Sequence, residues 1–372
     1  MKIGIPTEIK NNENRVAITP AGVHELVRRG HEVFIQGGAG EGSGFADFDY
    51  IEQGAITMVT AEEIWKTADM VLKVKEPIAS EYSLLRKDQV LFTYLHLAAS
   101  RECTDALLKA GTTGIAYETV QLPNRSLPLL QPMSEVAGRL SAQIGANQLM
   151  STQGGRGVLM GGVPGAPKAK VVVIGGGVAG ENAATVAHGM QADVTVIDVS
   201  LPKLREIDAR FSGTIRTRVS TALEITEQLR DADLVIGSVL IPGEKAPKLV
   251  TKEMVRNMKP GSVLVDIAID QGGCFEGSVP TTHDNPTYKV HDSIYYSVAN
   301  MPGAVPATAT RALTNATLPY VIALADKGWK AALAADESLA KGLNTFAGKI
   351  VHAGVRQAFP ELPAIEVAEA IA

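Results

Sequence analysis

Short runs of β-branched and apolar residues recur along most of the chain, and helical patterns separate them. The clearest example spans residues 170–198, KVVVIGGGVAGENAATVAHGMQADVTVID. Its opening run, 171–174, is typical of a strand buried on both faces. Small apolar residues follow at helical spacing, and a second β-branched run, 194–197, ends at Asp198. This stretch predicts a complete strand–helix–strand unit.

The same alternation predicts two α/β regions, each with a parallel sheet flanked by helices. The first has strand patterns at 3–5, 33–35, 70–74, 90–94 and 114–118 and helical patterns at 20–29 and 61–68. The second has strand patterns at 171–174, 194–197, 216–219, 234–236, 263–265 and 294–298 and helical patterns at 202–210, 221–230 and 251–258.

The length of 372 residues exceeds the roughly 250–300 residues at which one core usually splits, so two domains are expected. Long helical patterns at 129–152, with Ser134 as the predicted N-cap, and at 305–326 flank the second region. Short helices and polar turns are expected from there to residue 372. We therefore predict a doubly wound Rossmann domain at 129–307, inserted into a Rossmann-like α/β domain formed by 1–128 and 308–372. The two long helices are expected to bridge a cleft between the domains, where ligands often bind.

Three glycines follow the first strand of the inserted domain. Gly175 allows a tight turn, Gly177 lets the backbone approach a pyrophosphate, and Gly180 lets helix and strand pack closely. The helix N-terminus then offers backbone N–H groups and partial positive charge to phosphates. This spacing predicts dinucleotide binding, although such a turn can also exist without a ligand.

Asp198 ends the second strand, where a carboxylate can accept hydrogen bonds from the ribose hydroxyls of NAD. The same carboxylate would repel the 2′-phosphate of NADP, at a cost of about 4 kcal/mol for a like-charge pair near 4 Å. The sequence therefore favours NAD over NADP. The alternative is an ordinary surface aspartate at a strand end.

The charge and composition narrow the choice of partners. A net charge of −5 and a pI near 5.9 argue against nucleic acid and an anionic membrane surface. No apolar run approaches the ~18–20 residues of a membrane span, and the N-terminal segment lacks a signal-peptide pattern. Cys103 and Cys274 are too few for a disulfide framework and lack metal-site spacing, so both are expected to be buried. These features predict a cytoplasmic protein without a metal site.

Five polar residues are candidates for chemistry. Lys75 and His96 each follow a strand pattern, and ligands bind at the carboxyl ends of strands in open α/β sheets. Arg15, in the loop before the first helix, suits bidentate capture of a carboxylate. Asp270 and Asn300 follow strand patterns of the inserted domain. Alternatively, these residues are solvated charges, a structural histidine, a loop-capping aspartate and a turn-forming asparagine.

Several motifs together strongly resemble the bacterial alanine dehydrogenase family. They are KIGIPTEIKNNENRVAITP at the N-terminus, KVKEP at 73–77, YLHLA at 94–98, GGGVAG at 175–180, VDIAIDQGG at 265–273 and SVANMPGAVPATATRALTNATLPY at 297–320. The resemblance covers essentially the whole chain. It implies a substrate domain (1–128 and 308–372), an inserted NAD domain (129–307), a homo-oligomer, typically a hexamer, and NAD-dependent oxidative deamination of L-alanine to pyruvate and ammonium through iminopyruvate.

The resemblance also implies roles for individual positions. Arg15 and Lys75 would hold the substrate carboxylate and carbonyl oxygen, His96 would be the general acid/base, and Asp270 would assist at the amine and the attacking water. One departure is Val279, where some relatives have an arginine. The implied cofactor surface comprises Ser134, Gly175, Gly177, Val178, Gly180, Asp198, Lys203, Ser220, Val239, Leu240, Ile267, Asp270, Asn300, Met301 and Pro302.

Three other interpretations stay open from the sequence. The soluble nucleotide-binding component of a proton-translocating transhydrogenase resembles this chain in its fold and N-terminal motifs. A saccharopine-type dehydrogenase is similar in fold but would need a different pocket. A nicotinamide-binding module without catalysis is the alternative outside enzymes.

Overall fold

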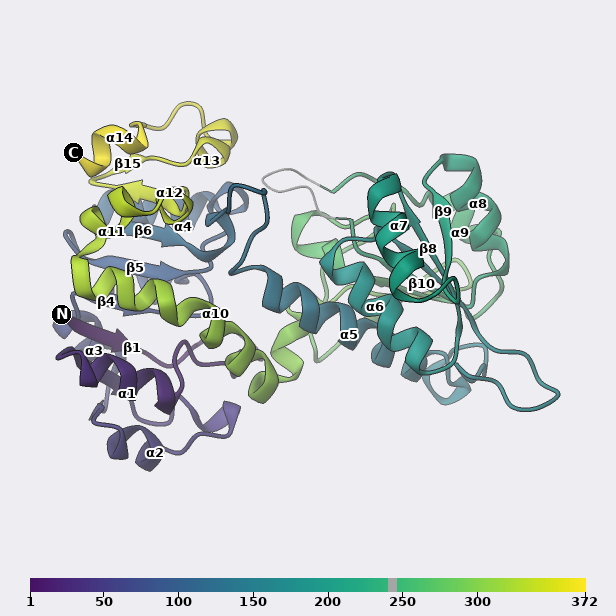
Figure 1. The fold of residues 1–372 in the computed structure, drawn as a ribbon, viewed down its shortest axis with the longest axis horizontal. Helices are drawn as coiled ribbons and strands as arrows, with labels where there is room; N and C mark the ends of the chain where they lie inside the picture. The colour runs from purple at the N-terminus through teal and green to yellow at the C-terminus, as the bar shows by residue number, and fades with distance from the viewer. Residues whose placement is uncertain (240–245) are drawn as a thin grey trace. The chain divides into compact units, whose positions relative to one another are not determined.

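The structure is a computed structural model that describes residues 1–239 and 246–372. The chain forms two compact units, which are visible as the two groups of elements in Figure 1. The first unit comprises Met1–Met133 and Val305–Ala372, and the second comprises Ser134–Ala304. The second unit is thus inserted within the sequence of the first.

The first unit is built on an eight-stranded sheet with the order β15-β14-β6-β5-β4-β1-β2-β3. Strands β1 to β6 are parallel, whereas β14 pairs antiparallel with β6 and β15 antiparallel with β14. The strands are β1 (Lys2–Ile5), β2 (Glu32–Gln36), β3 (Ile56–Met58), β4 (Met70–Leu72), β5 (Val90–Thr93), β6 (Thr113–Ala116), β14 (Leu343–Phe346) and β15 (Lys349–Ile350). The sequence patterns missed β3, β14 and β15.

The helices of the first unit begin at recognisable caps. The Thr19 side chain accepts from the Gly22 N–H at the start of α1, and Thr60 and Glu63 form a capping box at the start of α3. The longest helix, α10, continues through Pro319. The helices are α1 (Pro20–Arg28), α2 (Asp47–Glu52), α3 (Ala61–Thr67), α4 (Arg101–Ala110), α10 (Pro306–Lys327), α11 (Trp329–Ala335), α12 (Glu337–Ala340), α13 (Ala353–Ala358) and α14 (Val367–Ile371).

The second unit is built on a seven-stranded sheet with the order β12-β13-β11-β10-β7-β8-β9. All its strands are parallel except β12, which pairs antiparallel with β13 and was not expected. The strands are β7 (Lys170–Ile174), β8 (Asp193–Asp198), β9 (Arg216–Val219), β10 (Leu234–Gly237), β11 (Val263–Asp266), β12 (Thr287–Val290) and β13 (Ser293–Tyr296). The helices are α5 (Gln131–Gln148), α6 (Val178–Gly189), α7 (Leu201–Arg210), α8 (Ala222–Asp231) and α9 (Lys252–Arg256).

One predicted helix start was wrong. The sequence suggested Ser134 as the N-cap of the long helix, but α5 begins at Gln131, and Ser134 lies within its first turn. Pro132 therefore occupies an early helical position, where the missing N–H costs no helical hydrogen bond.

The parallel strands of both sheets have the same spatial order. Numbered within each unit, the six parallel strands have the order 3-2-1-4-5-6, which is the order of a doubly wound Rossmann fold. The strand order reverses between β1 and β4 in the first unit and between β7 and β10 in the second. Ligands bind outside the carboxyl ends of strands at such a reversal point. The predicted α/β class with two Rossmann-like units is confirmed.

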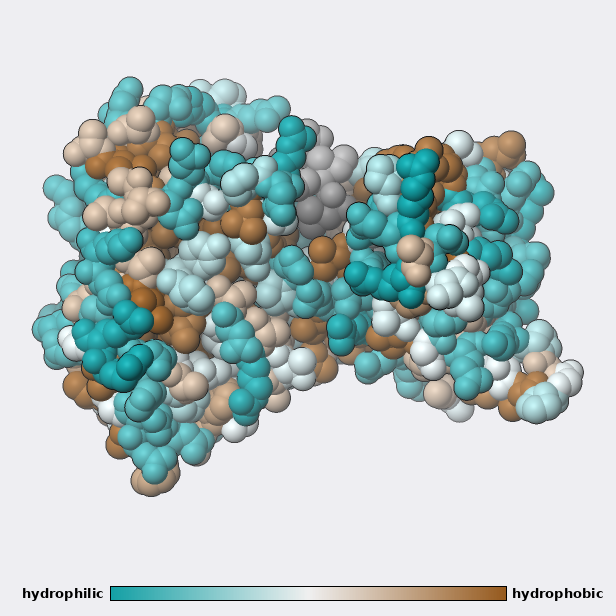
Figure 2. Space-filling view, in the orientation of Figure 1, coloured by the Kyte–Doolittle hydropathy of each residue, from teal (hydrophilic) through white to brown (hydrophobic). Residues whose placement is uncertain are grey.

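The surface is mainly polar. On the face drawn in Figure 2, hydrophilic residues cover most of both units, and hydrophobic residues form separated patches. Within the described residues, no helix combines the length and apolar character that a membrane span requires. The apolar side chains gather instead around the sheets, as in the cluster of Val172, Val235, Leu264, Phe275 and Tyr295.

Candidate functional site

In the first unit, the predicted residues Lys75 and His96 lie at one edge of the sheet. Lys75 follows β4 and His96 follows β5, and these parallel strands are neighbours. Glu8 follows β1, which pairs with β4 on its other side. The three residues therefore come from the carboxyl ends of adjacent strands, at the reversal point of the sheet. Both Lys75 and His96 are half-buried.

The guanidinium of Arg15 already binds a carboxylate within the chain. Its Nε donates to Glu13 Oε1 at 2.7 Å, and its Nη2 donates to Glu13 Oε2 at 2.5 Å. Nη1 contacts the sulfur of Met133 at 3.1 Å. Burial disfavours the charged form, but the Glu13 carboxylate outweighs it, so the pKa of Arg15 is raised. The bidentate contact in the structure is thus made with Glu13, and capture of a substrate carboxylate by Arg15 stays a prediction.

A buried ion network supports the segment that carries Lys75. Lys73 is 1% exposed, and its Nζ lies 3.1 Å from Glu8 Oε2 and 2.9 Å from Glu81 Oε1. Burial raises the pKa of Glu8, and the Lys73 charge offsets that rise only in part. Burial also disfavours the charged form of Lys73, but the Glu8 and Glu81 carboxylates raise its pKa. Sequence reasoning missed this network because each member alone resembles a surface charge.

Glu76 adds a carboxylate beside the predicted residues. Its side chain forms an ion pair with Lys10. Burial opposes ionisation of Glu76, but the combined charges of His96, Lys10 and Lys75 outweigh it and lower its pKa. Glu76 therefore lies within electrostatic range of both Lys75 and His96, and it is ionised at neutral pH.

His96 has an unusual backbone conformation. Its φ angle is 49°, in the left-handed region that non-glycine residues seldom adopt. Its ring stacks on the Tyr94 ring with centroids 5.9 Å apart and an interplanar angle of 17°. Its backbone N–H donates to Glu118 Oε1 at 2.7 Å. Residues held in such conformations cluster at functional sites.

In the second unit, each glycine of the turn has a distinct steric role. Gly175 has a φ of 98°, and a Cβ on Gly180 would lie 1.7 Å from the Gly175 carbonyl oxygen. A Cβ on Gly177 would meet nothing within 4 Å, and Gly177 and Val178 are exposed. Helix α6 begins at Val178 without a side-chain cap. The N-cap residue therefore supplies no side-chain acceptor to the first N–H groups of the helix, which fits binding of the pyrophosphate of a dinucleotide there.

Asp198 organises the glycine turn. Its Oδ2 accepts from the Gly176 N–H at 2.6 Å, and its Oδ1 accepts from the Ser200 N–H at 2.7 Å. A carboxylate has about four acceptor positions, so two N–H donors leave capacity for ribose hydroxyls. Lys203 lies beside this turn but pairs with Glu181 at 2.9 Å and Glu206 at 3.1 Å.

The two cysteines are buried, as expected. Burial raises the pKa of each thiol to about 12. The reactive form of cysteine is the thiolate, so neither Cys103 nor Cys274 is a candidate nucleophile.

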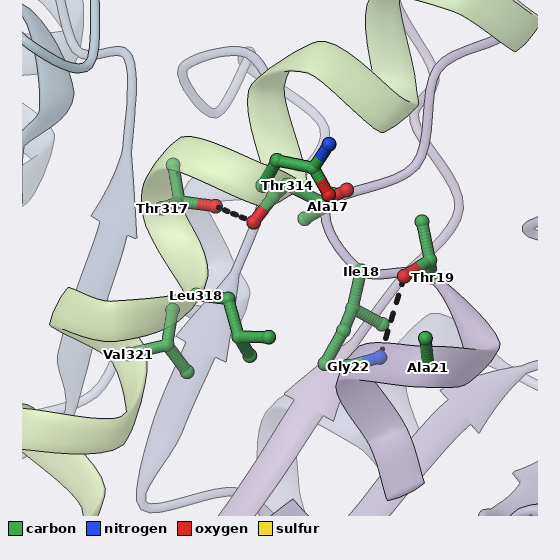
Figure 3. A pocket seen from close by; sticks show the side chains of 10 residues that line it. Ala17, Ile18, Thr19, Ala21, Gly22, Thr314, Thr317, Leu318 and Val321 are labelled. Carbon is green, nitrogen blue, oxygen red and sulfur yellow. Dashed lines mark hydrogen bonds between the residues drawn. The ribbon is translucent and has the colours of Figure 1, made fainter. Parts of the chain in front are cut away.

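A small cavity lies between α1 and α10, and none of the predicted site residues lines it (Figure 3). Its volume is about 50 Å³. Ile18, Gly22, Thr314, Leu318 and Val321 are among its lining residues, none of which is ionisable. This cavity therefore lacks the groups that proton transfer requires.

Two family descriptions match the chain. Alanine dehydrogenase/PNT, N-terminal domain, matches residues 4–137, and alanine dehydrogenase/PNT, C-terminal domain, matches residues 141–353. The chain belongs to this family.

Individual members of the alanine dehydrogenase/PNT family match over nearly the whole chain. The alanine dehydrogenase of Mycolicibacterium smegmatis is 64% identical over 372 residues, which is 100% of both chains. A solved L-alanine dehydrogenase structure has 54% identity and a TM-score of 0.93, with 97% of this chain and 99% of that chain covered. A solved transhydrogenase structure from Sinorhizobium meliloti has 28% identity and a TM-score of 0.80, with coverages of 95% and 99%. The resemblance seen in the sequence is confirmed.

The other positions implied by the family resemblance follow strands of the second sheet. Ser220 follows β9, Val239 follows β10, and Ile267 and Asp270 lie in the 3-10 turn Ile267–Gln271 after β11. Asn300 precedes the 3-10 turn Met301–Ala304, which contains Met301 and Pro302, and its carbonyl oxygen contacts His283 Nε2 at 2.8 Å. Leu240 lies outside the described residues. Because β9, β10, β11 and β13 are parallel, these positions lie at one edge of the sheet.

A second network, centred on the buried Asp266, shapes the loop around Asp270, and sequence reasoning missed its roles. Asp266 accepts from the backbone N–H of Cys274 at 3.1 Å and from the Ser278 hydroxyl at 2.5 Å. Lys248 Nζ donates to the carbonyl oxygens of Gly273, at 2.9 Å, and Phe275, at 3.1 Å. Burial raises the pKa of Asp266, and these donors counter the rise only in part.

Proposed function

We propose that this chain is an NAD-dependent amino-acid dehydrogenase that oxidises L-alanine to pyruvate and ammonium, reversibly. The observation that carries the proposal is the placement of Lys75 and His96 at the ends of adjacent strands, in a chain 64% identical along its full length to an alanine dehydrogenase. The net reaction converts alanine, NAD and water to pyruvate, ammonium, NADH and a proton.

The first unit would bind the substrate carboxylate. Glu13 holds the Nε and Nη2 edge of Arg15 and so fixes the plane of the guanidinium. Nη1 contacts the Met133 sulfur, a weak acceptor, and a substrate carboxylate would make a stronger, charge-assisted bond to the guanidinium. Lys75 would bind the oxygen that becomes the pyruvate carbonyl.

His96 would move the protons. After oxidation at the substrate carbon, water adds to the resulting iminopyruvate, and the carbinolamine collapses to pyruvate and ammonia. These steps need a group that exchanges protons near neutral pH, which is the property of an imidazole. A positioned acid/base contributes about 10²–10⁴-fold in rate. Asp270 would assist at the amine and the attacking water, a role supported by the family resemblance.

NAD is the proposed cofactor of the second unit, and it supplies the acceptor for the hydride when bound. The open face of Gly177 and the uncapped start of α6 support binding of its pyrophosphate. The position and spare acceptor capacity of Asp198 support binding of the ribose hydroxyls.

Three further statements are proposals. Assembly as a homo-hexamer and a role in amino-acid catabolism rest on the family resemblance, and location in the cytoplasm rests on the charge, composition and cysteine content of the sequence. Light scattering on the purified protein would test the hexamer.

The proposed reaction is tested by following NADH absorbance with purified protein, NAD and L-alanine at alkaline pH. D-alanine, L-lysine and NADP serve as comparison reactants. We expect NADH only with L-alanine and NAD together. Absence of turnover with any amino acid, alongside intact NADH binding, would refute the proposal and favour a transhydrogenase component or a non-catalytic nicotinamide-binding module.

A further inference from the structure

Two carboxylates hold the backbone at the two predicted functional residues of the first sheet. Glu8 Oε1 accepts from the N–H groups of Val74, at 2.5 Å, and Lys75, at 3.4 Å. Glu118 accepts from the N–H groups of Leu95, at 3.2 Å, and His96, at 2.7 Å. In each case the carboxylate accepts hydrogen bonds from the backbone N–H groups of the predicted functional residue and of the residue before it.

Each carboxylate comes from the strand beside the one that it serves. Glu8 follows β1, the neighbour of β4, and Glu118 lies in the 3-10 turn Tyr117–Thr119 after β6, the neighbour of β5. At these points the parallel ladder has ended, so the N–H groups need acceptors other than a neighbouring strand. The two carboxylates supply them at the edge where Lys75 and His96 lie.

Glu118 contacts the backbone of a residue in an unfavourable conformation. In the left-handed region the Cβ of an L-residue approaches the following carbonyl oxygen, so His96 would ordinarily leave a φ of 49°. The hydrogen bonds to Glu118 hold the peptide plane between Leu95 and His96, and this plane is the frame from which the φ of His96 places its side chain. Stacking of the imidazole on Tyr94 depends on the same conformation.

We propose that Glu118 is a positioning residue, which holds the imidazole of His96 in its working orientation through hydrogen bonds to the backbone rather than through its charge. The expected effect on catalysis rests on the proposed dehydrogenase function. The hydrogen bonds between Glu118 and the backbone at His96 do not depend on that function. Glu118 need not touch the substrate for this role.

Glu118 is a better residue to vary than Glu8. Removing the Glu8 carboxylate would leave the buried Lys73 with only Glu81 as a partner and would disturb the fold. Glu118 is half-buried, and its Oε1 accepts from the His96 N–H at 2.7 Å, while the Leu95 N–H is shared between Oε1 and Oε2, each at 3.2 Å. The amide oxygen of Glu118→Gln can keep the hydrogen bonds that Oε1 accepts, without the charge and without the Oε2 contact to Leu95, whereas Glu118→Ala keeps none of them.

Asp69 provides the matched control. Its Oδ2 accepts from the Lys2 N–H at 2.8 Å, so it is also a carboxylate that holds a strand backbone in this sheet. It is exposed and precedes β4, at the opposite edge from Lys75 and His96. Asp69→Ala therefore removes the same kind of contact without touching the predicted functional residues.

The test measures kcat and KM for L-alanine and the hydrogen exchange of the Leu95 and His96 amides in the four proteins. In Glu118→Ala we expect kcat to fall by about 10- to 100-fold, the range produced by misplacing a catalytic group. KM should stay within about threefold, because Arg15 keeps its contacts. Amide exchange should become faster in Glu118→Ala alone, and kcat should stay within about threefold in Glu118→Gln and Asp69→Ala.

The outcomes separate the two proposals. Unchanged kcat or unchanged amide exchange in Glu118→Ala would overturn the role of Glu118. Equal loss in Glu118→Gln and Glu118→Ala would overturn it too, since charge rather than hydrogen-bond acceptance would then matter. If the unchanged protein does not oxidise alanine, the dehydrogenase function fails, and the exchange measurement alone decides whether Glu118 holds His96.

Discussion

Replacing Gly177 by alanine should weaken dinucleotide binding while leaving the fold intact. A Cβ at this position meets nothing within 4 Å, and the residue has extended backbone with a φ of −65° that alanine adopts without strain. The added methyl group would nevertheless stand at the start of α6, where the proposed pyrophosphate contacts the backbone. Gly177 is therefore a position at which ligand affinity and stability should separate.

The magnitudes follow from the contacts. Alanine gains about 0.4–1 kcal/mol from the reduced entropy of the unfolded chain and loses a similar amount as a poorer N-cap, so stability should change by less than about 1 kcal/mol. Losing one hydrogen bond to a charged phosphate costs about 1.5–3 kcal/mol. That range corresponds to an NADH affinity about 10- to 150-fold weaker.

Alanine variants at two other glycines of the same unit serve as comparisons. A Cβ on Gly180 would lie 1.7 Å from the Gly175 carbonyl oxygen and 2.6 Å from Ser238 Oγ, so Gly180→Ala must displace backbone. We expect it to lose about 3 kcal/mol of stability and about 6–12 °C of Tm. Gly189, at the other end of α6, also has open space around a Cβ, and Gly189→Ala should leave NADH affinity unchanged.

NADH fluorescence titration and thermal unfolding of the four proteins make the comparison. If Gly177→Ala binds NADH within twofold of the unchanged chain, the phosphates do not approach this turn, and the dinucleotide site assigned to the glycines is wrong. If its Tm falls as far as that of Gly180→Ala, the steric distinction between the two glycines is wrong.

Three further variants test the first unit. Lys73→Met should lose about 3–5 kcal/mol in urea unfolding, because Glu8 and Glu81 would be buried without a cation; a loss below about 1 kcal/mol would contradict this. The pKa of Glu76 is lowered in the folded state, so its contribution to stability is present above the ordinary value of 4.5 and is lost as pH falls through the folded value. Glu76→Gln should therefore unfold more easily than the unchanged chain at neutral pH and equally easily in strong acid, as unfolding at both pH values would show. Arg15→Lys should raise KM for L-alanine by about tenfold or more through loss of the planar fork, with NADH affinity unchanged in the same titration.

The sequence predicted the central strands better than the edge strands. The runs that became β7, β8, β10 and β11 are β-branched or apolar and lie almost wholly inside, so their own composition identifies them. The missed strands β3, β12 and β15 are short and partly exposed, and β14 pairs antiparallel outside the parallel order. β3 and β14 pair with strands that are distant in the sequence, whereas β12 and β15 pair with the strand next to them in the chain. Short strands at a sheet edge bury few residues, so the local pattern is weak.

The residues of the candidate site also divide into those that a local pattern predicts and those that depend on partners elsewhere in the fold. Lys75 and His96 were found because they follow strong strand patterns, and the glycines because their spacing has a known purpose. Glu8, Lys73 and Glu118 were missed, because their partners depend on β1 lying beside β4 and β6 lying beside β5. A charged residue that is buried and paired looks in the sequence like one that is solvated.

The two units share one strand order, and the connection after the first strand explains why they would bind different ligands. In the second unit, the turn from β7 leads through Gly175 and Gly177 directly into α6, whose N-terminus has no side-chain cap. In the first unit, residues 6–19 separate β1 from α1, and the Thr19 side chain caps that helix. A capped N-terminus has fewer N–H groups to offer a phosphate, while the longer connection carries Glu13 and Arg15. In the proposed function, the same scaffold would therefore present helix N–H groups to a dinucleotide in one unit and a guanidinium to a carboxylate in the other.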